Sequence, residues 1–387
     1  MIDFNPYDWS FHEDPYPIYQ ALREEAPCYR NEKLGFWALS RHEDVMTALK
    51  DWKTFSSADG VALEFFGPSA SAVMSFLAMD PPLHDRVRAL VSEGFTPRRV
   101  QRFEPRVRAL ANHYIDQFIE RGSCEFVSEF AGRLPMDVIS EMIGVPEGDR
   151  ETIRCWADLV VHREEGQSEI PPEGVQASGN LLNYFQEMVT SYRKEPQEDL
   201  TSSLIAAEID GDRLEDREII AFLFLMAIAG NETTTKILTH AFYWLHQFPE
   251  QRARVEEDPS LIPAWVEETL RYDNSSQILY RTLTENLEMH GETMKKGDRV
   301  ALLIGSANRD HRVFERPDEF DLSRDCGAST SFGRGVHFCL GASLARLETI
   351  VSLQEIQRRM SDIQLDRDRL VRAHSGNVRG FAVMPMA

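Results

Sequence analysis

The chain has 387 residues, of which 42% are hydrophobic, so it can bury a large core and enclose a cofactor. Its formal net charge of −21 disfavours nucleic acid and anionic membrane surfaces as partners. The N-terminal residues lack the basic and apolar segments of a signal peptide, and the longest apolar run, residues 219–229, is about half of the ~20 residues that a spanning helix needs. We therefore expect a cytoplasmic protein that has no nucleic-acid partner and no membrane anchor.

Apolar residues recur at three- and four-residue steps along most of the chain, and this periodicity predicts helices. In chain order, the expected helices cover residues 16–25, 42–50, 83–95, 98–120, 128–143, 179–192 and 217–248. Short runs of β-branched and aromatic residues predict strands at 35–40, 278–283, 299–304 and 379–384. Because no repeat or linker divides the chain, we expect one mainly α-helical domain over residues 1–387, with β-rich parts at about 28–60 and 276–304 packed on the helical body.

The predicted helix at 217–248 is long and apolar nearly all round at its start, so it should run through the core. Its interior contains a run of poor helix formers, Ala229-Gly230-Asn231-Glu232-Thr233-Thr234. The glycine either lets another element pack closely or belongs to a functional interruption, and the residues alone favour neither interpretation.

Cys339 differs from the other four cysteines, Cys28, Cys124, Cys155 and Cys326, which we expect to be free thiols in a reducing compartment. No two cysteines have the spacing of a zinc site. Cys339 instead ends a glycine-rich run and precedes an amphipathic helix, whose free N–H groups and dipole favour a thiolate. A thiolate in this position can bind iron.

The run around this cysteine, Phe332-Gly333-Arg334-Gly335-Val336-His337-Phe338-Cys339-Leu340-Gly341, resembles the Phe-x-x-Gly-x-His-x-Cys-x-Gly signature of the cytochrome P450 family at every fixed position. Further matches follow in order over about residues 12–384. The resemblance implies the P450 fold, with haem b between the central helix and the cysteine loop and with Cys339 as the iron ligand. The other haem contacts that it implies are His84, Arg88, Ala229, Gly230, Arg281, Phe332, Gly333, His337 and Gly341.

The same resemblance implies a monooxygenase that uses O2 and two externally supplied electrons. Thr233 would donate a hydrogen bond near dioxygen, and Glu232, where aspartate is commoner, would relay protons from solvent. Glu268 and Arg271, three residues apart, would form a buried structural ion pair. No flavin or iron–sulfur domain accompanies the sequence, so we expect ferredoxin and ferredoxin reductase as donors, docking on the basic residues Arg98, Arg99, Arg102 and Arg334.

The expected substrate is a small or medium-sized lipophilic molecule. Its predicted contacts are Phe65, Phe66, Met74, Phe76, Leu77, Leu225, Ala229, Ile278 and Leu279. The segment Asn274-Ser275-Ser276-Gln277 lacks the proline that the family often has there, so the shape of this wall is not predicted.

Three alternatives differ in activity. A peroxygenase would use peroxide directly and would not need the relay of Glu232 and Thr233. A haem-binding sensor would keep the cofactor and oxidise nothing. An all-helical interaction protein without a cofactor would not explain the run of residues around Cys339.

Overall fold

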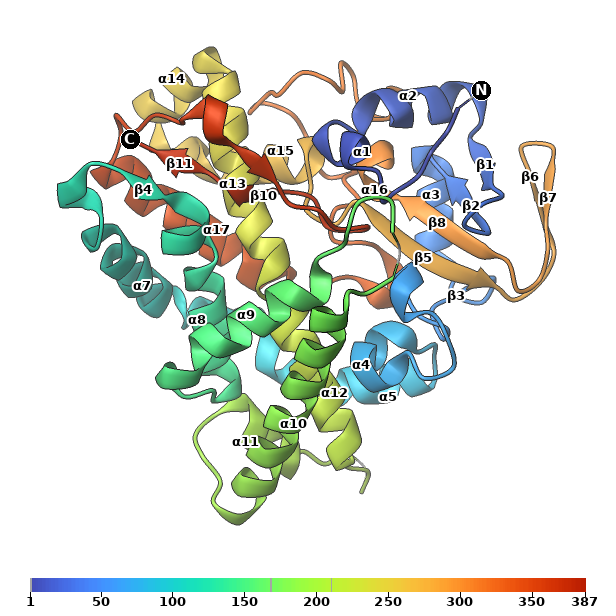
Figure 1. Cartoon of the computed structure of the whole chain (residues 1–387), viewed down its shortest axis with the longest axis horizontal. Helices are drawn as coiled ribbons and strands as arrows, with labels where there is room; N and C mark the ends of the chain where they lie inside the picture. Colours follow the sequence, from blue (N-terminus) through green and yellow to red (C-terminus); the bar gives the residue numbers. More distant parts are fainter. Residues whose placement is uncertain (1, 168, 210) are drawn as a thin grey trace.

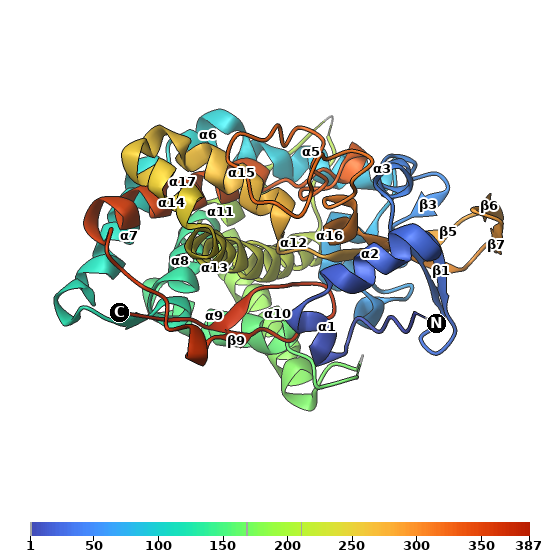
Figure 2. The same cartoon turned by 90° about the horizontal axis from the view of Figure 1, so that it is seen from above.

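The predicted central helix organises the fold, but it is not continuous. The computed structural model describes residues 2–167, 169–209 and 211–387. It divides the helix into α12 (Asp216–Ala229) and α13 (Glu232–Gln247), which cross the middle of the molecule (Figures 1 and 2). Next to the break, Thr233 Oγ1 donates to the Ala229 carbonyl at 2.8 Å and Thr235 Oγ1 donates to the Asn231 carbonyl at 3.0 Å. The Thr233 hydroxyl thus takes the carbonyl that the Thr233 N–H would use in a regular helix, which favours the interruption. At Thr235 the backbone N–H still donates to the Asn231 carbonyl at 3.0 Å, so regular helix has resumed there.

Other helices surround this pair, and several begin or end elsewhere than predicted. The expected helix at 98–120 breaks into α6 and α7, and the one at 128–143 begins with a π-helical turn at Val127–Ala131. In chain order the helices around α12 and α13 are α1 (Trp9–Glu13), α2 (Tyr16–Glu25), α3 (His42–Lys50), α4 (Ser71–Met74), α5 (Leu83–Ser92), α6 (Pro97–Gln101), α7 (Glu104–Asp116), α8 (Arg133–Ile143), α9 (Arg150–Val161), α10 (Pro172–Lys194), α11 (Leu200–Ala206), α14 (Pro249–Glu257), α15 (Ile262–Tyr272), α16 (Ile304–Ala307) and α17 (Ala342–Arg359).

A small sheet lies beside the helical mass, next to α2 and α3 (Figure 1). Its order is β1-β2-β8-β5-β3, and only β2 and β8 run parallel. These strands are β1 (Cys28–Asn31), β2 (Phe36–Leu39), β3 (Phe55–Ser56), β5 (Ile278–Leu283) and β8 (Arg299–Leu303). Three two-stranded pairs complete the β structure: β4 (Cys124–Glu125) with β11 (Pro385–Met386), β6 (Leu287–Met289) with β7 (Glu292–Met294), and β9 (Val371–Arg372) with β10 (Phe381–Val383). That residues 1–387 form one domain stays a prediction.

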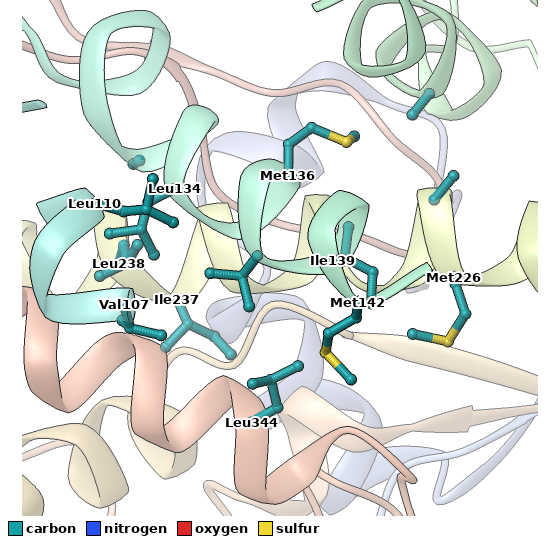
Figure 3. Packing of buried hydrophobic residues seen from close by; sticks show 14 of the residues in the cluster. Val107, Leu110, Leu134, Met136, Ile139, Met142, Met226, Ile237, Leu238 and Leu344 are labelled. Atoms are coloured by element: carbon teal, nitrogen blue, oxygen red, sulfur yellow. The ribbon is translucent and has the colours of Figure 1, made fainter. Parts of the chain in front are cut away.

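The largest hydrophobic core lies where α7, α8 and α17 pack around α12 and α13. Figure 3 shows Ile139 and Met142 of α8 beside Met226 of α12, with Leu344 of α17 below Met142 in this view. A Cβ atom added to Gly230 would lie 3.1 Å from Ile139 Cγ1. The glycine therefore lets α8 approach closely, in addition to ending α12. In the described part of the chain, no helix has the length and apolarity required to cross a membrane.

Candidate active site

A cavity with a largely apolar lining lies beside the break between α12 and α13. Its empty volume is about 1200 Å³, including the space where it opens to solvent. Four separate parts of the chain form its walls, and they include Leu49, Val61, Phe76, Leu77, Arg88 and Phe95; Leu225, Met226, Ala229, Gly230, Thr233 and Ile237; Leu270, Asn274, Ser275, Ser276, Leu279 and Arg281; and Ser331, Phe332, Gly333, His337, Cys339, Leu340 and Gly341. The fold thus places the cysteine loop and the interruption of the central helix at the same cavity.

The cysteine loop is held open by its own backbone. Gly333 and Gly335 adopt φ of 68° and 70°, conformations that favour glycine. The Cys339 N–H donates to the Phe332 carbonyl at 2.9 Å, which fixes the loop just before α17 begins. Cys339 is exposed to the cavity, and a Cβ atom added to Gly341 would meet nothing within 4 Å. This side of the cavity therefore has room for a flat group against the sulfur.

The helix N-terminus does not by itself lower the pKa of Cys339. Although the sulfur faces the cavity, it lies deep in the protein, and its desolvation raises the pKa of the thiol above its usual value. The N–H groups of Gly341 and Ala342 and the charges of Arg88 and Arg346 oppose that effect. The expected lowering by the helix start is therefore outweighed by desolvation. A metal ion bound to the sulfur would favour its ionised form.

A cluster of basic side chains lies at the same cavity. Arg88, Arg281 and His337 line it, and the ring of His84 lies 4.4 Å from that of His337 between centroids. His84 is paired with an acid, since its Nδ1 lies 2.8 Å from Asp85 Oδ1. His84 Nε2 and Arg88 Nη1 are buried and have no hydrogen-bond partner among the residues that the structure describes. Burial lowers the pKa of Arg281 to about 10, and burial with the neighbouring Arg281 and His84 lowers that of His337 to about 2.

Unpaired hydrogen-bond donors beside an apolar cavity can bind the carboxylates of a ligand whose apolar part fills the cavity. A haem, with its flat ring and two propionates, meets both requirements at this site. The residues present therefore fit the cofactor that the sequence predicted.

Thr233 and Glu232, the polar residues expected beside the interruption of the central helix, have side chains that point in different directions. Thr233 lines the cavity. Glu232 is buried outside its lining, where Lys236 Nζ lies 3.4 Å from Glu232 Oε2 and the Asp158 carboxyl of α9 is in hydrogen-bond contact. Burial alone would raise the pKa of Glu232, but Lys236 and Asp158 hold it below its usual value. The four-residue spacing to Lys236 could have revealed that partner, whereas no local pattern indicates Asp158.

Five of the predicted substrate contacts line the cavity, namely Phe76, Leu77, Leu225, Ala229 and Leu279. Phe65, Phe66, Met74 and Ile278, all of them described residues, lie outside its lining. Alternation along β5 places Leu279 and Arg281 on the cavity side and packs Ile278 in the core beneath the small sheet.

Three polar residues, Asn274, Ser275 and Ser276, form the wall that the sequence left undefined. The Gln277 side-chain amide donates to the Asn274 carbonyl at 2.7 Å, and the Arg379 N–H donates to the Ser275 carbonyl at 2.7 Å. These hydrogen bonds fix the segment in place of the missing proline.

The pair Glu268 and Arg271 lies in the core behind the cysteine loop. Its two N–O distances are 2.7 and 2.8 Å, and both side chains are almost fully buried. Arg271 Nη1 also donates to the carbonyls of Asn308 and Pro317 at 3.0 and 2.8 Å. The pair therefore ties α15 to the long segment that leads to Cys339.

Comparisons with known proteins agree with this geometry. The model of the cytochrome P450 family matches residues 175–361. Cytochrome P450 123 of Mycobacterium tuberculosis is 54% identical over 99% of this chain and 96% of its own length. The methyl-branched lipid omega-hydroxylase of the same species is 36% identical over 91% of this chain and 84% of its own. The structure of CYP109E1 from Bacillus megaterium in complex with testosterone has a TM-score of 0.91 at 30% identity, covering 97% of this chain and 98% of that one.

Fold, cavity and relatives together define a haem-dependent oxidoreductase. The chain belongs to the cytochrome P450 family, as the run around Cys339 predicted. Its cofactor is haem b and its activity is that of a monooxygenase, and the predicted P450 fold is confirmed.

Proposed function

We propose that this enzyme oxidises a small or medium-sized lipophilic substrate, with Cys339 as the iron ligand and with electrons from a ferredoxin and its reductase. The cavity carries the proposal, because it combines one exposed sulfur, an apolar lining and nearby buried N–H donors of His84 and Arg88 that have no hydrogen-bond partner among the described residues. When bound there, haem supplies O2 activation and the oxidation of a substrate C–H bond. The cytoplasm is the proposed location, since the five cysteines are all free thiols.

The residues of the chain have separate tasks in this proposal. His84, Arg88, Arg281 and His337 hold the propionates. Ala229, Gly230, Phe332, Gly333 and Gly341 border the ring with small or flat groups. The Thr233 hydroxyl, which can rotate from the Ala229 carbonyl, offers a proton inside the cavity, and Glu232 supplies that proton from the other side of α13.

The substrate class follows from the lining. Phe76, Leu77, Leu225 and Leu279 exclude water and give no charged contact, so shape and apolar area select the molecule. Two relatives support this class, since CYP109E1 was crystallised with testosterone and another relative hydroxylates a methyl-branched lipid. Phe65, Phe66, Met74 and Ile278 would act only indirectly, by packing behind the lining.

The electron donor is proposed from the charge on the cysteine-loop side. Arg98, Arg99 and Arg102 are exposed on and just after α6, which packs against α17. Arg334 borders an open depression together with Phe338 and Arg346. An acidic ferredoxin would meet positive charge here on a protein whose net charge is −21.

Replacement of Cys339 tests the proposal at its centre. Carbon monoxide added to the reduced wild type should give the long-wavelength absorption band of thiolate ligation. The Cys339→Ser variant should lose that band and oxidative turnover, while Cys155→Ser, which removes an exposed thiol elsewhere, should keep both. An unchanged band and full turnover in Cys339→Ser would refute the assignment.

Charge reversal tests the docking surface. The combined variant R98E/R99E/R102E should be reduced by ferredoxin at least about tenfold more slowly at low salt, because steering is lost. The substrate-induced spin shift should stay unchanged. Arg369→Glu, at another exposed arginine, is the control. Equal reduction rates in all three proteins would show that the donor docks elsewhere.

A further inference from the structure

Glu232 is one half of a carboxyl pair. The Asp158 carboxyl on α9 is in hydrogen-bond contact with it, and α9 packs directly against α12. A cation flanks each acid: Arg154 Nη1 lies 2.8 Å from Asp158 Oδ2, and Lys236 Nζ lies 3.4 Å from Glu232 Oε2. The four side chains form one cluster between two elements that are far apart in the sequence.

Lys236 is fixed in this cluster by its surroundings. Its ammonium also donates to the Phe381 carbonyl at 3.2 Å. A Cβ atom added to Gly380 would lie 2.5 Å from Lys236 Cβ, so the lysine stem packs against bare backbone. The positive charge next to Glu232 therefore has little freedom to move away.

The pair spans the distance from solvent to the interior. The Asp158 side chain is 41% exposed, whereas that of Glu232 is 7% exposed. The next residue along α13, Thr233, lines the cavity. A proton that enters at Asp158 can thus reach the edge of the active site through one buried acid.

Two carboxyls in contact repel each other when both are ionised, and this repulsion favours one proton shared by the pair. Although part of the Asp158 side chain is exposed, desolvation of the rest and the adjoining Glu232 raise the pKa of Asp158, while Lys236 and Asp158 hold that of Glu232 low despite its burial. At neutral pH the shared proton therefore belongs to Asp158, and Glu232 is the acceptor.

On the basis of the relay role proposed for Glu232, we propose that Asp158 is a positioning residue that stores the proton which Glu232 takes up in each turnover. In the transfer, the O–H bond of Asp158 breaks as an O–H bond forms on a Glu232 oxygen. Solvent water then reprotonates Asp158, and buffer neutralises the hydroxide that remains. Arg154 stabilises the negative charge when it lies on Asp158, and Lys236 stabilises it when it lies on Glu232.

The proposal has a definite pH dependence. The charged and titratable groups around the pair are Glu151, Arg154 and Cys155 on α9 and Lys236 on α13. Turnover should fall as pH rises through the raised pKa of Asp158, because the stored proton is then lost to solvent. This alkaline decrease should be absent from Asp158→Asn.

Asp158→Asn tests the proposal against a matched control. Glu151→Gln removes another carboxylate from the same arginine, since Glu151 Oε1 lies 2.6 Å from Arg154 Nη2 and makes no contact with Glu232. Asp158→Glu is the conservative rescue. Each purified holoenzyme is compared for haem content, thermal unfolding, turnover and solvent isotope effect, and by the infrared band of a protonated carboxyl in the ferric state.

Asp158→Asn should lower turnover about tenfold, less than the ~10²-fold or more that direct acid–base catalysis contributes, with a larger solvent isotope effect. Its protonated-carboxyl absorption should be smaller than that of the wild type, while the contribution of the buried Glu348 remains. Glu151→Gln should match the wild type, and Asp158→Glu should recover most of the turnover. Wild-type turnover and isotope effect in Asp158→Asn, with Glu232→Gln impaired, would overturn the role of Asp158 alone. Wild-type behaviour of Glu232→Gln would overturn the relay proposed for that residue.

Discussion

At Gly335 a missing side chain lets the cysteine loop lie against the end of α3. The residue has a φ of 70°, and a Cβ atom there would come within 2.8 Å of the Leu49 carbonyl oxygen and 3.1 Å of Lys50 Cα. Both neighbours are backbone atoms, which cannot rotate away. The glycine is therefore required by packing as well as by conformation.

The variant Gly335→Ala should consequently lose more stability than its conformation alone explains. A left-handed alanine costs about 1–2 kcal/mol, and overpacking adds a further ~1–3 kcal/mol. Gly297→Ala is the control, since Gly297 has a φ of 89° and nothing within 4 Å of an added Cβ atom. Urea unfolding of the two variants should therefore differ by ~1 kcal/mol or more, and equal losses would show that the loop shifts to make room.

Residues such as Cys339, His337 and Gly335 could be predicted because they lie within one short run whose chemistry is local. Asp158 could not be predicted, since α9 reaches Glu232 only through tertiary packing. The same limit explains Phe66: the sequence shows an aromatic residue near the expected pocket, but its ring packs under the Arg299 guanidinium, 4.9 Å away.

Among the elements, a buried ion pair joins the 3₁₀ turn Leu63–Phe65 to the segment after α9. Arg163 Nε lies 3.2 Å from Glu64 Oε1, and both side chains are 4% exposed. The Arg163 N–H also donates to the His374 carbonyl at 3.1 Å, in the loop between β9 and β10. Three segments that are distant in the sequence thus meet at one charge pair.

Removal of one partner should leave the other buried and uncompensated. Glu64→Gln should reduce the free energy of unfolding by roughly 3–5 kcal/mol. The double variant E64Q/R163M should be more stable than Glu64→Gln, because it no longer buries a lone guanidinium. Urea unfolding of both variants and of Arg163→Met measures this coupling, and strictly additive losses would mean that the pair contributes nothing.

Helices were predicted well where one face is apolar, as for α2 and α3, whose bounds agree with the periodicity. Periodicity could not show the break at Arg102–Phe103 or the one at Gly230–Asn231, since apolar spacing continues across both. In the second case the weak helix formers indicated a break, and the Thr233 hydroxyl, which takes the Ala229 carbonyl, favours it.

For the molecule as a whole, buried histidines contribute to the loss of stability in acid. Burial lowers the pKa of His12 to about 4 and that of His240 to about 3. In the unfolded chain both would titrate near ~6.5, so below that pH the unfolded state binds protons that the folded state cannot. Stability is therefore complete above about pH 6.5 and decreases as the pH falls toward the folded-state values.

His240→Gln should make this decrease shallower. His240 Nδ1 lies 2.6 Å from the Asp273 carbonyl, and a glutamine amide can still donate there. The urea midpoint of the wild type should fall between pH 7 and 5, and that of the variant should fall less over the same range, whatever its stability at pH 7. Parallel curves would assign the acid sensitivity to other groups.

The positions of the four walls in the sequence determine at which stage of synthesis the complete cavity can form. One wall is complete by Phe95, but the last one ends at Gly341. A ribosome makes these segments in order, so a nascent chain has no complete cofactor cleft until almost all of it has been synthesised. The complete site for haem can therefore form only when synthesis of the chain is nearly finished.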